Sequence, residues 1–255
     1  MEPYIGITDF MNFGQVERML KVFNEHKPQG SNRKLHVGVM MSYKTLKGIP
    51  NKWQNVFPPK ETIANIFSSD DTYNCLHYAD YDKNLDLWKS LAHAIFYGGV
   101  GINALQLDMV WPDPTQIASA VHSSRKQIEV ILQIGRNAME DAGNNPKVVA
   151  NRLGEYDGII HRVLLDKSMG RGLGMDAQEL IPFAQEIKTR FPELGIVAAG
   201  GLGPETMHLV QPLVEKFSDI SIDAQSRLRP SGNALDPVDW SMAEEYLVNA
   251  LKLFP

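Results

Sequence analysis

Strand-like and helix-like segments alternate from end to end of this chain of 255 residues. Short apolar runs, rich in β-branched residues, suit strands that are buried on both faces. The expected strands span residues 4–8, 35–42, 73–78, 102–107, 128–134, 158–165, 195–199 and 220–222. Such alternation is typical of βα units and a parallel sheet.

Eight βα units in a chain of this length predict one (β/α)8 TIM barrel domain over residues 1–255. The expected helices span residues 15–24, 60–67, 85–97, 114–122, 146–153, 177–191, 205–217 and 240–253. The third strand, in "TYNCLHYAD", is the least hydrophobic of the set. If that segment is not a strand, an open doubly wound sheet is the better interpretation.

Charge and composition exclude several classes of partner. The net charge of -5 argues against a basic surface that grips nucleic acid. Cys75 is the only cysteine, so no intramolecular disulfide can form. The N-terminus has no signal-peptide pattern, and no apolar run is long enough to span a membrane. We expect a cytoplasmic protein without nucleic-acid or membrane partners, and the sequence leaves a homo-oligomer open.

Residues 43–61 form a long connection after the second strand, "YKTLKGIPNKWQNVFPPKE". Long βα loops of barrels are commonly active-site lids. A lid would account for lysines and for Trp53 and Phe57 near a ligand. The alternative is a surface loop that these two aromatic residues pin to the barrel.

The stretch "IVAAGGLGPETM" joins the seventh strand to the next expected helix. Gly200 and Gly201 have no Cβ, so another group can approach their backbone closely. Pro204 fits the first turn of a helix. Backbone N–H groups at such a turn bind anions, usually phosphate. The alternative is a tight βα turn that binds nothing.

In a barrel the chemistry lies at the carboxyl ends of the strands. Acids and amides dominate there and suit proton transfer on a small polar metabolite. The residues at these ends are Thr8, Asp9, Ser42, Lys44, His77, Asp80, Asp108, Gln133, Arg136, Asp166, Lys167, Gly200, Gly201, Asp223, Gln225 and Ser226. Aspartates also ligate divalent cations, but no spacing singles out a cluster, so a metal site is the less favoured interpretation.

Some of these polar residues have structural interpretations as well. Asp9 and Asp113 could each cap a helix N-terminus, and Asp236 or Asp239 could cap the last helix. His36 and His161 fall inside expected strands, where a buried structural role is more common. His77 lies nearer a strand end and is the better catalytic candidate.

Five segments occur in the order seen in one enzyme family: "YIGITDF", "NALQLD", "YDGIIHRVLLDKSMGRGLG", "IVAAGGLGPETM" and "ISIDAQSRLR". With them the chain resembles phosphoribosylanthranilate isomerase over most of its length. The resemblance implies a (β/α)8 barrel that converts an aminoaldose phosphate to an aminoketose by an Amadori rearrangement. It also implies that no cofactor is used.

The resemblance assigns roles to matching positions. Asp166 matches the general acid of the family. The implied phosphate-binding residues are Gly172 and Gly174 in "GRGLG", Gly200 and Gly201 in "AGGL", and Ser226 in the last loop. Arg227 stands where the family has glycine, and an arginine there could hold phosphate through its side chain.

Three departures from the family concern the reaction itself. Ile5 stands where the family has its catalytic cysteine, and an isoleucine cannot take a proton. Asp108 stands where the family has a histidine. The family binds the anthranilate carboxylate with an arginine after the second strand; this chain has none there, and Lys44 and Lys47 could substitute only approximately. Loss of a catalytic base costs on the order of 10² to 10⁴ in rate, which favours a different reaction.

The sequence therefore predicts an enzyme that acts on a small phosphorylated metabolite by acid/base proton transfer, as an isomerase, epimerase or lyase. Asp166 and Asp108 are the expected catalytic residues. Lys44, His77, Gln133 and Asp223 are further expected substrate-binding residues. Two alternatives remain: an inactive barrel that binds a phosphometabolite, and a metal-dependent aldolase or hydrolase.

Overall fold

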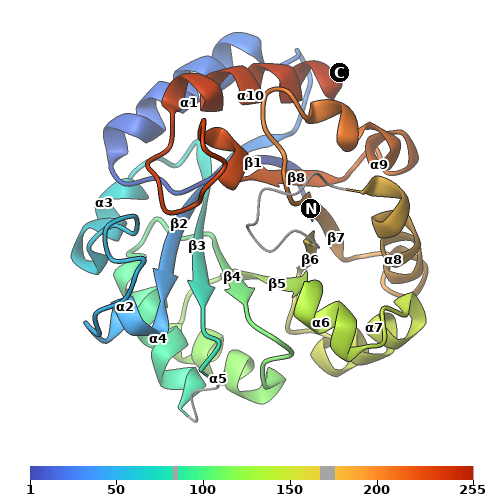
Figure 1. The fold of residues 1–255 in the computed structure, drawn as a ribbon. Coiled ribbons are helices and arrows are strands. Elements are labelled where there is room, and N and C mark those ends of the chain that lie inside the picture. Colours follow the sequence, from blue (N-terminus) through green and yellow to red (C-terminus); the bar gives the residue numbers. More distant parts are fainter. Residues whose placement is uncertain (83–85, 167–175, 255) are drawn as a thin grey trace.

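Eight parallel strands form a closed barrel in the order of the sequence, with the last strand beside the first (Figure 1). The computed structural model of the protein describes residues 1–82, 86–166 and 176–254. The strands are β1 (Tyr4–Thr8), β2 (Lys34–Ser42), β3 (Thr72–Ala79), β4 (Ala104–Asp108), β5 (Glu129–Gly135), β6 (Arg162–Asp166), β7 (Gly195–Ala199) and β8 (Ser221–Ala224). β3 pairs with both neighbours along its length, so the (β/α)8 barrel is confirmed and the open sheet is excluded.

Helices surround the barrel between successive strands (Figure 1). They are α1 (Phe13–His26), α2 (Tyr43–Leu46), α3 (Ile63–Ile66), α4 (Leu87–Tyr97), α5 (Pro114–Ser124), α6 (Arg136–Asp141), α7 (Pro146–Leu153), α8 (Ala177–Arg190), α9 (Gln211–Lys216) and α10 (Trp240–Leu253). Asp113 and Asp239 accept hydrogen bonds from backbone N–H groups at the starts of α5 and α10, which confirms both as N-caps. No helix in the described ranges has the length and apolar character needed to cross a membrane.

Side chains of the strands alternate between two separate cores. Ile5, Ile7 and their counterparts on the other strands pack outward against the helices. Tyr4, Cys75 and Ile131 belong to a smaller cluster that fills the inside of the barrel. Ile5 therefore faces the helix layer, so its position on β1 does not supply a group to the barrel mouth.

The expected helix over 205–217 is wrong in its first half. Pro204 lies in a turn, a short 3₁₀ segment covers Met207–Leu209, and α9 begins only at Gln211. The hydroxyl of Thr206 donates to the carbonyl oxygen of Gly201, at 2.8 Å, which folds this segment back into a turn. No helix N-terminus therefore follows the glycine pair directly.

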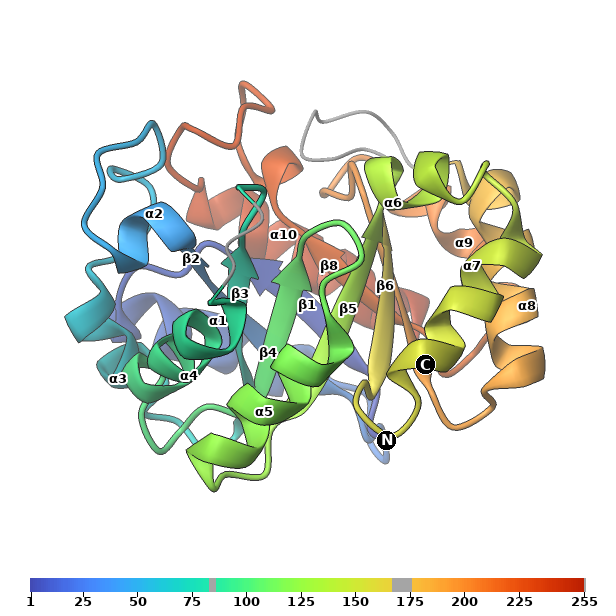
Figure 2. The same cartoon turned by 90° about the horizontal axis from the view of Figure 1, so that it is seen from below.

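The carboxyl ends of the strands lie on one side of the barrel, together with α2 and α6, while the N-terminus lies on the opposite side (Figure 2). Neither of these short helices was expected from the sequence. Ser42 caps α2 through its hydroxyl, which accepts from the backbone N–H of Thr45 at 3.2 Å. The long connection after β2 thus begins with a fixed helical turn at the barrel mouth.

Candidate functional site

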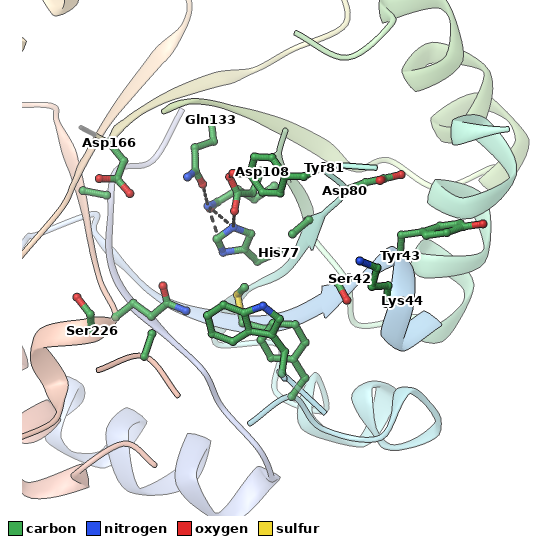
Figure 3. A pocket seen from close by; sticks show the side chains of 18 of the residues that line it. Ser42, Tyr43, Lys44, His77, Asp80, Tyr81, Asp108, Gln133, Asp166 and Ser226 are labelled. Carbon is green, nitrogen blue, oxygen red and sulfur yellow. Dashed lines mark hydrogen bonds and ion pairs between the residues drawn. The ribbon is translucent and has the colours of Figure 1, made fainter. Parts of the chain in front are cut away.

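A pocket of about 620 Å³ opens at the carboxyl ends of the strands. Its volume is in the range that small-molecule sites occupy, which is roughly 300 to 1,000 Å³. Of the expected site residues, those that line it are Lys44, His77, Asp108, Gln133, Asp166, Gly200, Gly201, Asp223 and Ser226. Figure 3 shows Asp108 and Gln133 beside His77, with Asp166 and Ser226 away from Lys44 across the pocket. The structure therefore brings residues of seven strands or their following loops to one cavity.

The other expected phosphate-binding residues are Arg227, Gly172 and Gly174. Arg227 is exposed and does not line the pocket. A Cβ on Gly203 would lie 2.7 Å from the Cβ of Arg227, so the backbone of the β8 loop packs against that glycine. Gly172 and Gly174 lie outside the described residues.

His77 is the centre of one group of contacts. Its Nε2 lies 3.8 Å from Oδ2 of Asp108, and the hydroxyl of Tyr81 donates to the other carboxylate oxygen of Asp108. Burial lowers the pKa of His77, but the hydrogen bond and charge of Asp108, with the charges of Asp223 and Asp9, outweigh burial and raise it above 6.5. The pocket therefore stabilises the imidazolium form of His77 relative to a free histidine.

The amide of Gln106 contacts the ring of His77 and is bonded in turn to the amide of Gln133. The Nε2 amide of Gln106 lies 3.3 Å from both ring nitrogens of His77 and donates to Oε1 of Gln133, at 3.0 Å. Gln106 and Gln133 come from adjacent strands, β4 and β5. Because both amides are buried, this contact orients the histidine ring toward the pocket.

Asp223, at the end of β8, is the second titratable group in the pocket with a shifted pKa. Burial raises the pKa of Asp223 to about 7, against the lowering effects of His77 and of a hydrogen bond from Thr8, while Asp9 and Asp166 raise it further. The Thr8 hydroxyl lies 3.1 Å from both carboxylate oxygens. Asp223 therefore exchanges a proton near neutral pH.

The long loop after β2 supplies an aromatic wall. Trp53 stacks on Phe57 with ring centroids 5.6 Å apart, and Lys52 lies over the Trp53 ring at 4.9 Å. All three residues line the pocket, and Phe57 is buried. Lys44 forms an exposed ion pair with Asp82 at 3.1 Å. The loop is thus pinned by its aromatic residues and also forms one wall of the cavity.

Asp9 is not a helix cap, because Asn12 caps α1. Instead Asp9 forms an ion pair with Arg229 in which both side chains are at most 3% exposed. Arg229 also donates to the carbonyl oxygens of Gln225 and Asp236, and Gln225 donates to Asp9 at 3.2 Å. This pair fixes the loop after β8, including the pocket residue Gln225.

Gly200 and Gly201 have backbone conformations that favour glycine, with φ of 113° and 67°. Within the described part of the chain, no hydrogen bond takes up their N–H groups. The preceding residue, Ala199, pairs with Asp166 on β6 and with Asp223 on β8. The glycine turn therefore lines the pocket between the positions of two carboxyl groups, with N–H groups that no hydrogen bond within the described residues takes up.

Reasoning from the sequence did not single out Tyr81, Gln106 or Arg229. Gln106 is an inward-facing residue of β4, and the period-2 pattern of that strand could have identified it. Tyr81 and Arg229 lie in loops, where no periodicity applies. Among the residues that the structure describes, no group of three or more histidine, cysteine or acidic side chains could hold a metal ion.

The fold and pocket define a (β/α)8 barrel with an acid-lined mouth. Comparison with known proteins finds solved structures with a similar fold. Active domain 2 of a chitinase from Pyrococcus furiosus, in a catalytic-site mutant, has 11% identity and a TM-score of 0.58, covering 98% of this chain and 94% of its own. Phosphonopyruvate hydrolase has 12% identity and a TM-score of 0.55, covering 87% of this chain and 74% of its own. At such identities the likeness shows the fold alone. No model of a known protein family matches the chain, and no curated protein matches it.

Proposed function

We propose that this chain is an enzyme that moves protons on a small polar metabolite at the barrel mouth. The observation that carries the proposal is the pair His77 and Asp223, which come from different strands and face one pocket. The pKa of each is raised toward or through the neutral range. A general acid and a general base work best when their pKa values lie near the working pH.

The two groups take complementary roles. His77, in its imidazolium form and beside the carboxylate of Asp108, delivers a proton to an oxygen of the ligand. Asp223, when ionised, removes a proton from the adjacent carbon. Asp166 lies on β6 at the same level of the barrel as Asp223 on β8, with Ala199 of β7 between them. Asp166 serves as a second acid. Proton removal at one atom and delivery at another is the common step of an isomerase, an epimerase or a lyase.

The ligand is proposed to carry a phosphate group, held by the backbone of Gly200 and Gly201 and by Ser226. The N–H groups of the glycine turn, which have no hydrogen-bond partner in the part of the chain that the structure describes, support this assignment. The buried Ser226 lies in the following loop and also lines the pocket.

An Amadori rearrangement of the phosphoribosylanthranilate isomerase type is the most specific form of this proposal. Ile5 occupies the position of that family's cysteine and packs outward into the helix layer. The base of this protein must therefore come from another strand, and Asp223 is our candidate. We favour a related reaction over that one, since both the base and the carboxylate-binding arginine differ.

The first test is a thermal-shift screen of phosphorylated sugars, each paired with its unphosphorylated form, with and without divalent cations. A ligand that binds only the folded state raises the melting temperature. We expect stabilisation by phosphorylated members that needs no cation. Stabilisation that requires a divalent cation would contradict the proposal and favour a metal-dependent aldolase or hydrolase.

The second test follows proton exchange in the ligand that the screen identifies. Proton NMR in D₂O is expected to show replacement of a carbon-bound hydrogen by deuterium. His77→Gln and Asp223→Asn are expected to slow this exchange on the order of 10² to 10⁴-fold. His93→Gln, an exposed substitution on α4, is the matched control and leaves the rate unchanged. Binding without exchange would identify the inactive binding barrel.

A further inference from the structure

Polar side chains lie inside the barrel, beneath the pocket, where their hydrogen-bonding groups find no partner among the described residues. The Tyr4 hydroxyl and both ring nitrogens of His36 are buried in this state. The two rings stack with centroids 4.5 Å apart on the adjacent strands β1 and β2. Because buried polar groups of folded proteins are nearly always hydrogen-bonded, these atoms point to a bound polar molecule.

His36 is a neutral imidazole in this environment. Burial first, and then the charges of His77 and Arg162, lower the pKa of His36 to about 3. A neutral imidazole has one N–H donor and one acceptor nitrogen. The two ring nitrogens of His36 therefore need an acceptor at one and a donor at the other, and a water molecule can take either role.

The carboxylate of Asp223 lies next to this histidine but does not bond to it directly. Oδ1 of Asp223 is 4.0 Å from Nδ1 of His36. No ion pair forms across this distance, because His36 is neutral. A separation above about 3.5 Å between two polar groups is where a bridging water molecule is found.

Gly6 lets the two side chains pack close to the backbone of β1. A Cβ at Gly6 would lie 2.6 Å from Oδ1 of Asp223 and 3.0 Å from Nδ1 of His36. Any other residue at this inward position of β1 would therefore clash with both side chains. Asp223 also lines the pocket, so a water molecule can enter from the barrel mouth.

We propose that the barrel interior binds an ordered water molecule between Asp223, His36 and the Tyr4 hydroxyl, and that this water positions the Asp223 carboxyl together with Thr8. Buried waters typically make about three hydrogen bonds to protein groups. Only the role of this water in proton transfer rests on the proposed function. Tyr4 and His36 are positioning residues, since they reach the ligand only through Asp223.

The groups that act on Asp223 come from several elements. Those that influence its charge are His77, Thr8, Asp9 and Asp166, and Asp223 in turn raises the pKa of Tyr4, Cys75 and Tyr246. Of these groups, Thr8 donates a hydrogen bond to the carboxylate of Asp223. The proposed water is a second donor to the carboxylate.

A high-resolution crystal structure of the full chain tests the water directly. We expect an electron-density peak within about 3.2 Å of Asp223 Oδ1, His36 Nδ1 and Tyr4 Oη. The proposal would be overturned if the Tyr4 hydroxyl or Nδ1 of His36 bonded directly to another side chain and no peak appeared at this position.

Paired substitutions test the same site in solution. Tyr4→Phe removes one partner of the water and is expected to lower the melting temperature by about 2 to 4 °C. Tyr246→Phe is the matched control, because its hydroxyl is equally buried and without a partner, but it packs in the apolar layer under α10. That variant is expected to melt at the wild-type temperature or above it. Equal effects of the two substitutions would refute a water specific to Tyr4.

Carboxyl ¹³C NMR measures the positioning role without any ligand. The titration midpoint of Asp223 is expected near 7 in the wild type and higher in Tyr4→Phe, because the ionised carboxylate loses its water donor. An unchanged midpoint would show that the water does not act on Asp223. Failure of the proposed enzyme activity would leave the diffraction, melting and titration results untouched, so the two ideas can fail separately.

Discussion

Asp223→Asn should change how the stability of the protein depends on pH. The folded pKa of Asp223 is about 7, against 3.8 for an ordinary aspartate, so the folded protein holds this proton more tightly than the unfolded chain. The stability contributed by this group is fully present below about pH 4. It is lost as the pH rises toward 7, since the buried carboxyl must then ionise.

The size of this effect follows from the shift in pKa. A shift of about three units corresponds to about 4 kcal/mol in the free energy of unfolding, of which about 3 kcal/mol falls between pH 5 and pH 8. The asparagine variant has no carboxyl to ionise. Its stability relative to the wild type should therefore improve by about 3 kcal/mol over this range.

Urea unfolding of both proteins at pH 5 and pH 8 measures the difference. Asp157→Asn is the matched control, because Asp157 is exposed before β6 at the opposite end of the barrel. That variant should follow the wild-type pH dependence. If the stability difference between Asp223→Asn and the wild type were the same at both pH values, the burial argument for Asp223 would be refuted.

Three further predictions concern other parts of the mouth. Arg229→Met leaves the buried Asp9 carboxylate unpaired and should lower the free energy of unfolding by about 3 to 5 kcal/mol in urea titrations; a loss below about 1 kcal/mol would contradict the buried pair. Gly200→Ala should weaken binding of the phosphorylated ligand in calorimetry at least tenfold, whereas the control Gly143→Ala, at a positive φ away from the pocket, should lose stability but not affinity. Asp166→Asn should reduce turnover of a confirmed substrate on the order of 10²-fold or more, and unchanged turnover would remove Asp166 from the mechanism.

The barrel could be predicted from the sequence because each strand carries a local signal. Apolar, β-branched runs locate all eight strands, and two of them, β1 and β7, have the predicted bounds. β6 begins four residues later than expected, since a 3₁₀ turn and Gly158 at a φ of 70° precede it. The helix after β7 was misplaced because a proline in a turn and a proline in a first helical turn look alike in sequence.

The sequence could predict only those site residues that lie at the ends of strands. His77, Asp108, Asp166 and Asp223 follow from their positions at the ends of strands. The partner of Asp9 could not be predicted, because Arg229 lies 220 residues away and only the closed barrel brings them together. The outward direction of Ile5 depends on the register of β1, which the motif "YIGIT" does not reveal.

The measurement that tests the central claim most directly is deuterium exchange into the ligand, followed by proton NMR in D₂O with the wild type, His77→Gln and Asp223→Asn. Our account predicts exchange at a carbon-bound hydrogen with the wild type and its near loss in both variants, while both still bind the ligand. Exchange at the wild-type rate in the two variants would contradict proton transfer by His77 and Asp223.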